Sequence, residues 1–99
     1  MPKFDNSVAA RALALRLIDI GQVARERLLA TLTFRERQVV LLRTSLGGGF
    51  PYTLEGVGRI FKVTCASVRA VERRAMAKLA AMLDEEEQYH GLQVNGPSW

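Results

Sequence analysis

The feature that most constrains this 99-residue chain is a pair of helical segments joined by only three residues. Thr53 can cap a short helix over residues 54–61, "KVT" makes a tight connection, and Thr64 can cap a longer helix. The residues expected to face inward recur at spacings of three and four: Val57, Ile60, Phe61, Val68, Val71, Ala75, Leu79 and Met82. A short helix, a three-residue turn and a longer helix are the spacing of a helix-turn-helix.

Two further helical segments precede this motif. In "TFRE", the Thr33 hydroxyl can accept a hydrogen bond from the Glu36 amide while the Glu36 carboxylate accepts one from the Thr33 amide, so a helix should begin at Phe34. It should end before "LGGGFPY", whose glycines and proline enforce a loop. Residues 7–30 carry one apolar stripe, which Gly21 is expected to bend or divide. The chain is therefore predicted to be all-α, a small helical bundle containing a helix-turn-helix.

Three parts follow from this pattern. Residues 1–31 form a leading amphipathic helix, residues 32–83 the helix-turn-helix domain, and residues 84–99 an acidic tail. Four acids come directly after Leu83, where they oppose the helix dipole. We therefore expect the last helix to fray there and the tail to be flexible.

Charge is distributed unevenly along the chain. All 14 Lys and Arg residues lie in residues 1–83 with six of the ten acids, a balance of +8. Such a charge favours an anionic partner, and nucleic acid is the leading candidate. A solvated basic surface is the alternative.

On the helix after Thr64, the side opposite the predicted core collects basic and small residues. Arg69 and Arg73 follow Cys65 at intervals of four, with alanines beside them. Arg and Lys contact phosphates, whereas alanine can only touch a thymine methyl group, so DNA binding with little base readout is expected. A helix that packs against protein through its alanines is the alternative. The candidate DNA-binding residues are Arg59, Lys62, Thr64, Cys65, Ala66, Arg69, Ala70, Arg73, Arg74 and Lys78.

Catalytic and metal chemistry find little support in the sequence. The single cysteine, Cys65, and the single histidine, His90, are far apart, and the adjacent acids Glu85–Glu87 read as a solvated helix end. We therefore expect no enzyme activity, no metal and no cofactor. One cysteine cannot form an internal disulfide, which agrees with a cytoplasmic protein, and no apolar run approaches the roughly 18 residues that span a bilayer.

Residues 32–79, "LTFRERQVVLLRTSLGGGFPYTLEGVGRIFKVTCASVRAVERRAMAKL", resemble region 4 of the bacterial housekeeping sigma factors. The most specific pieces are "LTFRE", "YTLEGVGRIF" and "VT" followed by "VRAVERRAMAKL". After "VT" the family has Arg-Glu-Arg and, two residues later, Arg-Gln, whereas this chain has "CAS" and then Arg69 and Ala70. The chain also has Thr44-Ser45 in place of Phe-Gly, and Gly56 in place of Glu.

The resemblance implies two binding activities. Region 4 of the family reads the minus-35 promoter element and docks on the flap-tip helix of the RNA polymerase β subunit. The apolar candidates for docking, some of which must fill the core, are Leu41, Leu42, Leu46, Phe50 and Tyr52.

Nothing in these residues resembles sigma region 2. We therefore expect one half of a split sigma factor whose region 2 is on a separate chain, a regulator, or a nonspecific DNA binder. The rival hypothesis is a protein-interaction module whose alanine-lined basic helix binds an acidic or helical partner or the chain's own "DEEE" segment.

Overall fold

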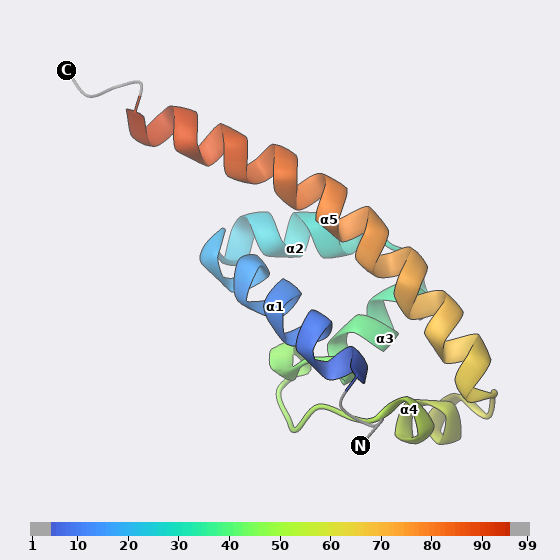
Figure 1. The fold of residues 1–99 in the computed structure, drawn as a ribbon. Helices are drawn as coiled ribbons and strands as arrows, with labels where there is room; N and C mark the ends of the chain where they lie inside the picture. Colours follow the sequence, from blue (N-terminus) through green and yellow to red (C-terminus); the bar gives the residue numbers. More distant parts are fainter. Residues whose placement is uncertain (1–4, 96–99) are drawn as a thin grey trace.

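The computed structural model describes the backbone of residues 5–95 and the side chains of residues 8–44 and 46–88. These residues form an all-α bundle, as predicted (Figure 1). In chain order the elements are α1 (Asp5–Asp19), α2 (Gln22–Ala30), α3 (Phe34–Arg43), the 3₁₀ turn η2 (Ser45–Gly47), α4 (Leu54–Phe61) and α5 (Cys65–Asn95). No helix among them combines the length and apolar character that crossing a bilayer requires.

Gly21 divides the leading helix into α1 and α2. Its φ of 92° lies in a region that glycine adopts at little cost, and its carbonyl accepts the first hydrogen bond of α2 from the Arg25 amide at 2.9 Å. The single helix expected over residues 7–30 is therefore two helices, broken at the residue that the sequence singled out.

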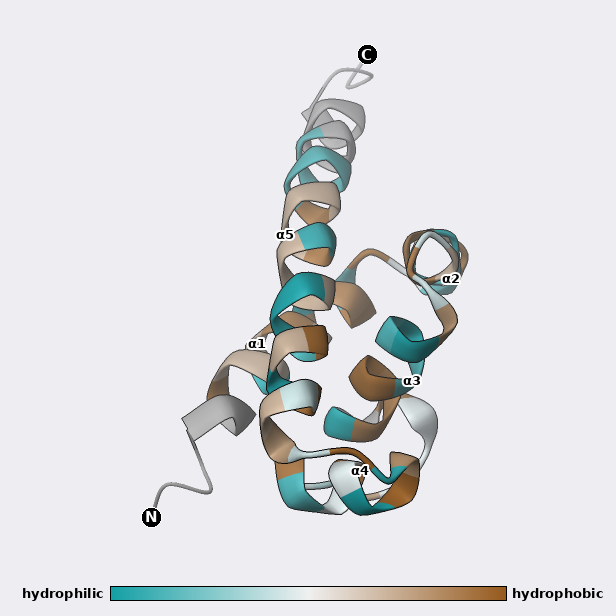
Figure 2. Cartoon of the chain, turned by 90° about the vertical axis from the view of Figure 1, so that its right-hand side faces the viewer, coloured by the Kyte–Doolittle hydropathy of each residue, from teal (hydrophilic) through white to brown (hydrophobic). Residues whose placement is uncertain are grey.

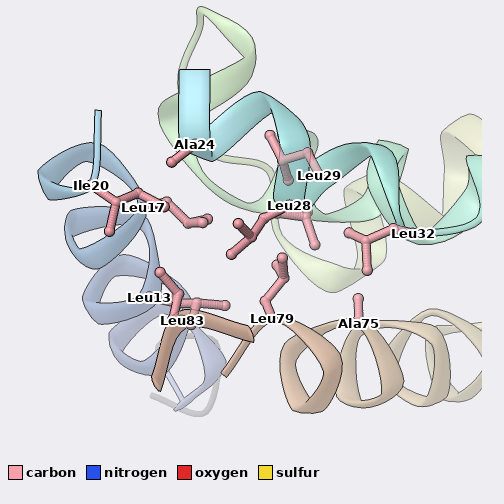
Figure 3. Packing of buried hydrophobic residues seen from close by; sticks show 11 residues of the cluster. Leu13, Leu17, Ile20, Ala24, Leu28, Leu29, Leu32, Ala75, Leu79 and Leu83 are labelled. Atoms are coloured by element: carbon pink, nitrogen blue, oxygen red, sulfur yellow. The ribbon is translucent and has the colours of Figure 1, made fainter. Parts of the chain in front are cut away.

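The main core lies between α1, α2 and α5. Leu13 and Leu17 of α1 point toward Leu28 of α2 and Leu79 and Leu83 of α5 (Figure 3). Leu17, Leu79 and Leu83 have no solvent exposure, so the middle of α5 is packed against the leading helices. Hydrophobic and hydrophilic residues alternate along the helices (Figure 2).

A second, smaller core holds the helix-turn-helix together. Val39 of α3, Val57 of α4 and Val68 of α5 are buried in one cluster, with Phe61 packed against it. Ile60, which was predicted to face inward, is instead 47% exposed. The eight-residue α4 turns Phe61 toward the cluster, and this leaves Ile60 on the other side of Val57.

The expectation that the last helix frays after Leu83 is wrong, because α5 continues to Asn95 and projects beyond the other helices (Figure 1). The acidic residues are held by cations of the leading helices. Arg16 lies 2.8 Å from both Asp84 and Glu87, and Arg27 lies 2.9 Å from Glu86. The Arg16 guanidinium lowers the pKa of the Glu87 carboxyl below its usual range. Residues 96–99 of the expected flexible tail lie outside the described residues.

Candidate nucleic-acid interface

The turn between α4 and α5 sets the position of the candidate DNA-facing helix. Lys62 ends α4 in the left-handed conformation with φ 60°, and the Val63 amide donates to the Gly58 carbonyl at 2.9 Å. A side chain at Gly58 would place its Cβ only 2.8 Å from the Val63 carbonyl oxygen, so this close approach requires glycine. Thr64 then caps α5 by accepting from the Ser67 amide at 3.1 Å, as predicted.

The outward side of α5 has the composition that the sequence predicted. Ala66, Arg69, Ala70 and Arg73 are exposed, and Cys65 is half-buried. The inward side of the same turns carries buried Val68 and Ala75. Small and basic side chains therefore share one solvent-facing surface near the start of α5.

Four exposed cations of α4, the turn after it and α5 form no ion pair within the described residues. Within the part of the chain that the structure describes, Arg59, Lys62, Arg69 and Arg73 are exposed and have no carboxylate within 4.0 Å. We call these four residues the basic face. Glu72, the acid beside Arg73 in sequence, points into the protein and is only 3% exposed. Glu55 is exposed on α4 one turn before Arg59, but it forms no ion pair within the described residues.

Glu72 forms a buried ion pair that the sequence analysis missed. Its carboxylate accepts from Arg43 Nε at 2.7 Å, and the side chains are 4% and 3% exposed. The same guanidinium donates to the Tyr52 carbonyl at 2.9 Å, so it joins α3 to α5 and to the loop before α4. The burial of Glu72 could have been predicted from the sequence, since it lies four residues after Val68 and three before Ala75, on the predicted core stripe. The pairing partner, 29 positions away, had no comparable signal.

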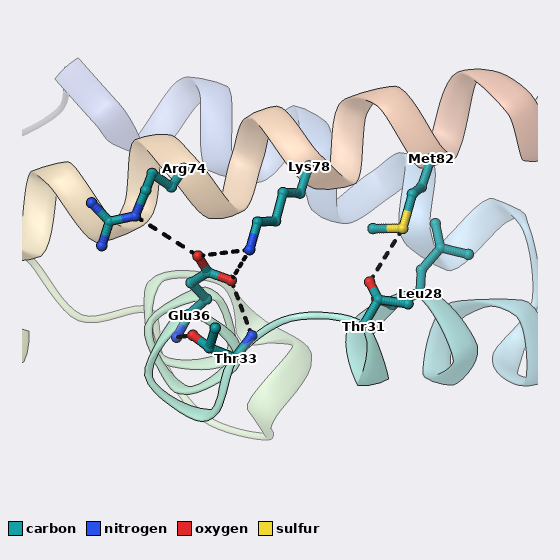
Figure 4. A network of polar contacts seen from close by, with 7 residues as sticks. All are labelled: Leu28, Thr31, Thr33, Glu36, Arg74, Lys78 and Met82. Carbon is teal, nitrogen blue, oxygen red and sulfur yellow. Dashed lines mark hydrogen bonds and ion pairs between the residues drawn. The ribbon is translucent and has the colours of Figure 1, made fainter.

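Two of the predicted DNA-binding cations are paired with an acid of α3. Lys78 Nζ lies 2.9 Å from Glu36 Oε1, and Arg74 Nε lies 3.8 Å from Glu36 Oε2 (Figure 4). Glu36 also completes the predicted capping box by accepting from the Thr33 amide at 3.0 Å. The Lys78 ammonium, with the Thr33 amide, lowers the pKa of the Glu36 carboxyl below its usual range. Arg74 and Lys78 therefore stabilise the α3–α5 packing and are weaker candidates for phosphate contacts than the basic face.

The alternative in which the chain's own acidic segment covers the basic face is wrong for the described part of that segment. Asp84, Glu86 and Glu87 pair with Arg16 and Arg27 on the leading helices, in the middle of α5 and well beyond its first turns. Among the residues whose side chains the structure describes, no acid of this segment covers the basic face.

Four of the five predicted docking residues line a hollow beside η2, and they differ in exposure. The hollow has a volume of about 270 Å³ and is lined by Leu41, Leu42, Phe50 and Tyr52 together with glycines of the loop. Phe50 is 91% exposed and Tyr52 46% exposed. Leu41 and Leu42 also pack against the two cores, and Leu46 packs against the main core without lining the hollow. Phe50 is therefore the most accessible apolar side chain of the predicted docking residues.

Comparison with known proteins identifies the same segment. Residues 28–81 match the sigma-70 region 4 family. Over 54 residues the chain is 44% identical to the RNA polymerase sigma-C factor of Nostoc sp. (strain PCC 7120), 48% to the RNA polymerase sigma factor SigA of Listeria monocytogenes and 46% to SigA of Microcystis aeruginosa. These matches cover 54% of this chain and only 13 or 14% of each relative, and no solved structure matches. Since the family match spans more than half of the chain and includes the whole helix-turn-helix, the protein belongs to the sigma-70 region 4 family.

Proposed function

We propose that this chain acts in transcription by binding duplex DNA through the basic face of α4 and α5, with little sequence readout. The observation that carries the proposal is the absence of counter-charge, within the described residues, around Arg59, Lys62, Arg69 and Arg73. Uncompensated cations on a helix-turn-helix gain the most from phosphate contacts, because binding releases the counterions condensed on DNA.

Weak sequence readout follows from the side chains that lie closest to the start of α5. Ala66 and Ala70 are exposed, and neither has a hydrogen-bond donor or acceptor for a base edge. Arg69 is the long side chain that lies between these two alanines, and contacts to phosphate and sugar account for at least half of the hydrogen bonds in protein–DNA complexes. We therefore assign Arg69 to the DNA backbone.

The experiment measures affinity for a labelled duplex by fluorescence anisotropy over a range of salt concentrations. Four phosphate contacts predict a log–log slope of about −3 to −4, and removing one of them by Arg69→Ala or Arg73→Ala should reduce its magnitude by about 1. Arg27→Ala is the matched control, because this arginine is 58% exposed on α2, away from the basic face. An equal loss in the control would refute the assignment of the interface.

Sequence readout is tested with the same assay. A duplex with a minus-35 element and its scrambled version should differ in affinity by less than about tenfold, since no paired base contact is available. A preference above about a hundredfold would refute weak readout. Absence of salt-dependent DNA binding altogether would favour the protein-interaction module.

A second candidate function, docking on the RNA polymerase β flap, is favoured by the hollow at Phe50. An exposed aromatic beside a hollow that is lined in part by leucines suits insertion of a partner helix, in which a few buried anchors supply most of the binding energy. Phe50→Asp should abolish binding to the isolated flap while the DNA salt slope is unchanged. Val23→Asp, on an apolar residue of α2 that is 78% exposed, is the control. No binding of the wild-type chain at high micromolar flap would refute docking.

In this proposal the chain is a region 4 unit that works with a separate chain supplying region 2 or regulates an initiation complex.

A further inference from the structure

Helix α1 is apolar on both of its sides. Leu13 and Leu17 face the main core (Figure 3), while Val8, Leu15 and Ile18 are 70%, 58% and 49% exposed on the opposite side. A surface helix normally carries polar residues on its solvent side, so an apolar outer side indicates a further packing partner.

Two residues of opposite charge, Arg11 and Asp19, lie at equal distances along the helix from Leu15 on this outer side. Arg11 lies four residues before Leu15 and Asp19 four residues after it, so the three residues lie on one row of the helix. Both charged residues are exposed, and neither forms an ion pair within the described part of the chain. Arg16 of the same helix, in contrast, is paired with two acids of α5.

We propose that the outer side of α1 binds a second copy of this chain, with the two α1 helices antiparallel about a two-fold axis beside Leu15. In that arrangement Leu15 meets Leu15 of the partner subunit, and Arg11 lies level with Asp19 of the partner subunit. The same ion pair forms twice, as a symmetric interface requires. Parallel pairing would bring Arg11 against its own copy and Asp19 against its own copy, so the charges select the antiparallel form.

The association is weak and reversible. A 15-residue helix is about 22 Å long at ~1.5 Å per residue, and one such helix pair buries less than the roughly 1,600 Å² of a standard stable interface. We therefore expect a dissociation constant in the range of about 10 to 300 μM.

The test is sedimentation equilibrium of the full chain up to about 1 mM, a concentration well above the expected dissociation constant. Arg11→Asp and Asp19→Arg each create two like-charge contacts per dimer and should raise the dissociation constant at least about tenfold. An equimolar mixture of the two variants recreates both ion pairs in the heterodimer, and it should associate within about threefold of wild type. Val23→Asp is the control and should change nothing, because this exposed residue lies on α2.

Asp19→Arg suits the dipole of α1, because it introduces a cation at the C-terminal end, and Arg11→Asp changes an exposed position outside the terminal turns. Far-UV circular dichroism confirms that each variant is folded. A wild-type chain that is monomeric throughout would overturn the proposal. So would a mixture that stays as weak as the single variants, or a control that weakens association equally. The assay contains no DNA, so its outcome is independent of the proposed function.

Discussion

Replacing Glu72 by alanine should destabilise this small domain more than any surface change, although Glu72 lies between cations on a helix proposed to face DNA. The reason is its environment. Glu72 is 3% exposed and accepts from Arg43 Nε at 2.7 Å, so Glu72→Ala leaves a guanidinium in the interior with only the Tyr52 carbonyl as an acceptor.

The size of the effect follows from the burial of both partners. Removing one member of a buried ion pair costs about 3–5 kcal/mol, because the remaining charge keeps its desolvation penalty. Domains of this size are stable by about 5–15 kcal/mol, so the change removes a large part of the total. At about 4–8 °C per kcal/mol, the melting temperature should fall by at least about 12 °C.

The assay is urea unfolding followed by circular dichroism at the helical band, with Arg27→Ala as the exposed counterpart. The Arg27 side chain is 58% exposed in its ion pair with Glu86, so its loss should cost no more than about 1 kcal/mol. Replacing both Arg43 and Glu72 by methionine should cost no more than about 2 kcal/mol, since no uncompensated charge remains. If Glu72→Ala costs no more than Arg27→Ala, the pair is not a buried determinant of stability.

Three further predictions concern the site and its turn. Because the folded-state pKa of Glu36 is lowered, its stabilising contribution is present above the unfolded pKa of about 4.3 and is lost as the pH falls through the folded value. Wild type should therefore exceed Glu36→Gln in free energy of unfolding at pH 7, and the difference should shrink as the pH falls below the unfolded pKa; a difference independent of pH would contradict this. Gly58→Ala forces a Cβ to 2.8 Å from the Val63 carbonyl oxygen and should lower the free energy of unfolding by about 1–3 kcal/mol. Gly49→Ala is the control, because a Cβ there meets nothing within 4 Å and should shift the urea midpoint little. Restoring the family's residues by Cys65→Arg, Ala66→Glu and Ala70→Gln should add about 1–3 kcal/mol of minus-35 preference per correct contact in the anisotropy assay, and a folded variant without any preference would show that α5 does not dock as in the family.

Local signals in the sequence were sufficient for most of the helices. The Thr33 capping box, the Thr53 and Thr64 caps and the break at Gly21 all depend on residues within a few positions of one another, and the structure contains each of them. Ile60 was misplaced because two apolar residues at spacings of three and four compete for one face of a helix of only eight residues.

Contacts between distant residues were not accessible to that reasoning. The extension of α5 past Leu83 depends on cations of α1 and α2 that lie far away in sequence, and the dipole argument considered only the helix itself. The same holds for Lys78, whose partner Glu36 is 42 positions away. A helical pattern shows which side chains share a face, but it does not show which charged partner another helix brings to that face.

The second hydrogen bond of Arg43 has a consequence for how the two candidate binding surfaces communicate. One guanidinium holds both the carbonyl of Tyr52, which lines the hollow, and the carboxylate of Glu72, which lies next to Arg73 of the basic face. A ligand in the hollow that displaces the Tyr52 carbonyl leaves an N–H group of the buried Arg43 guanidinium without an acceptor, which costs about 1–3 kcal/mol. A ligand that keeps the Tyr52 carbonyl in place preserves this hydrogen bond and the position of α5. Occupancy of one surface should therefore alter affinity at the other, and by thermodynamic reciprocity the factor is the same in both directions. A DNA titration with and without a hollow-bound helix, repeated with Arg43→Lys, measures this factor.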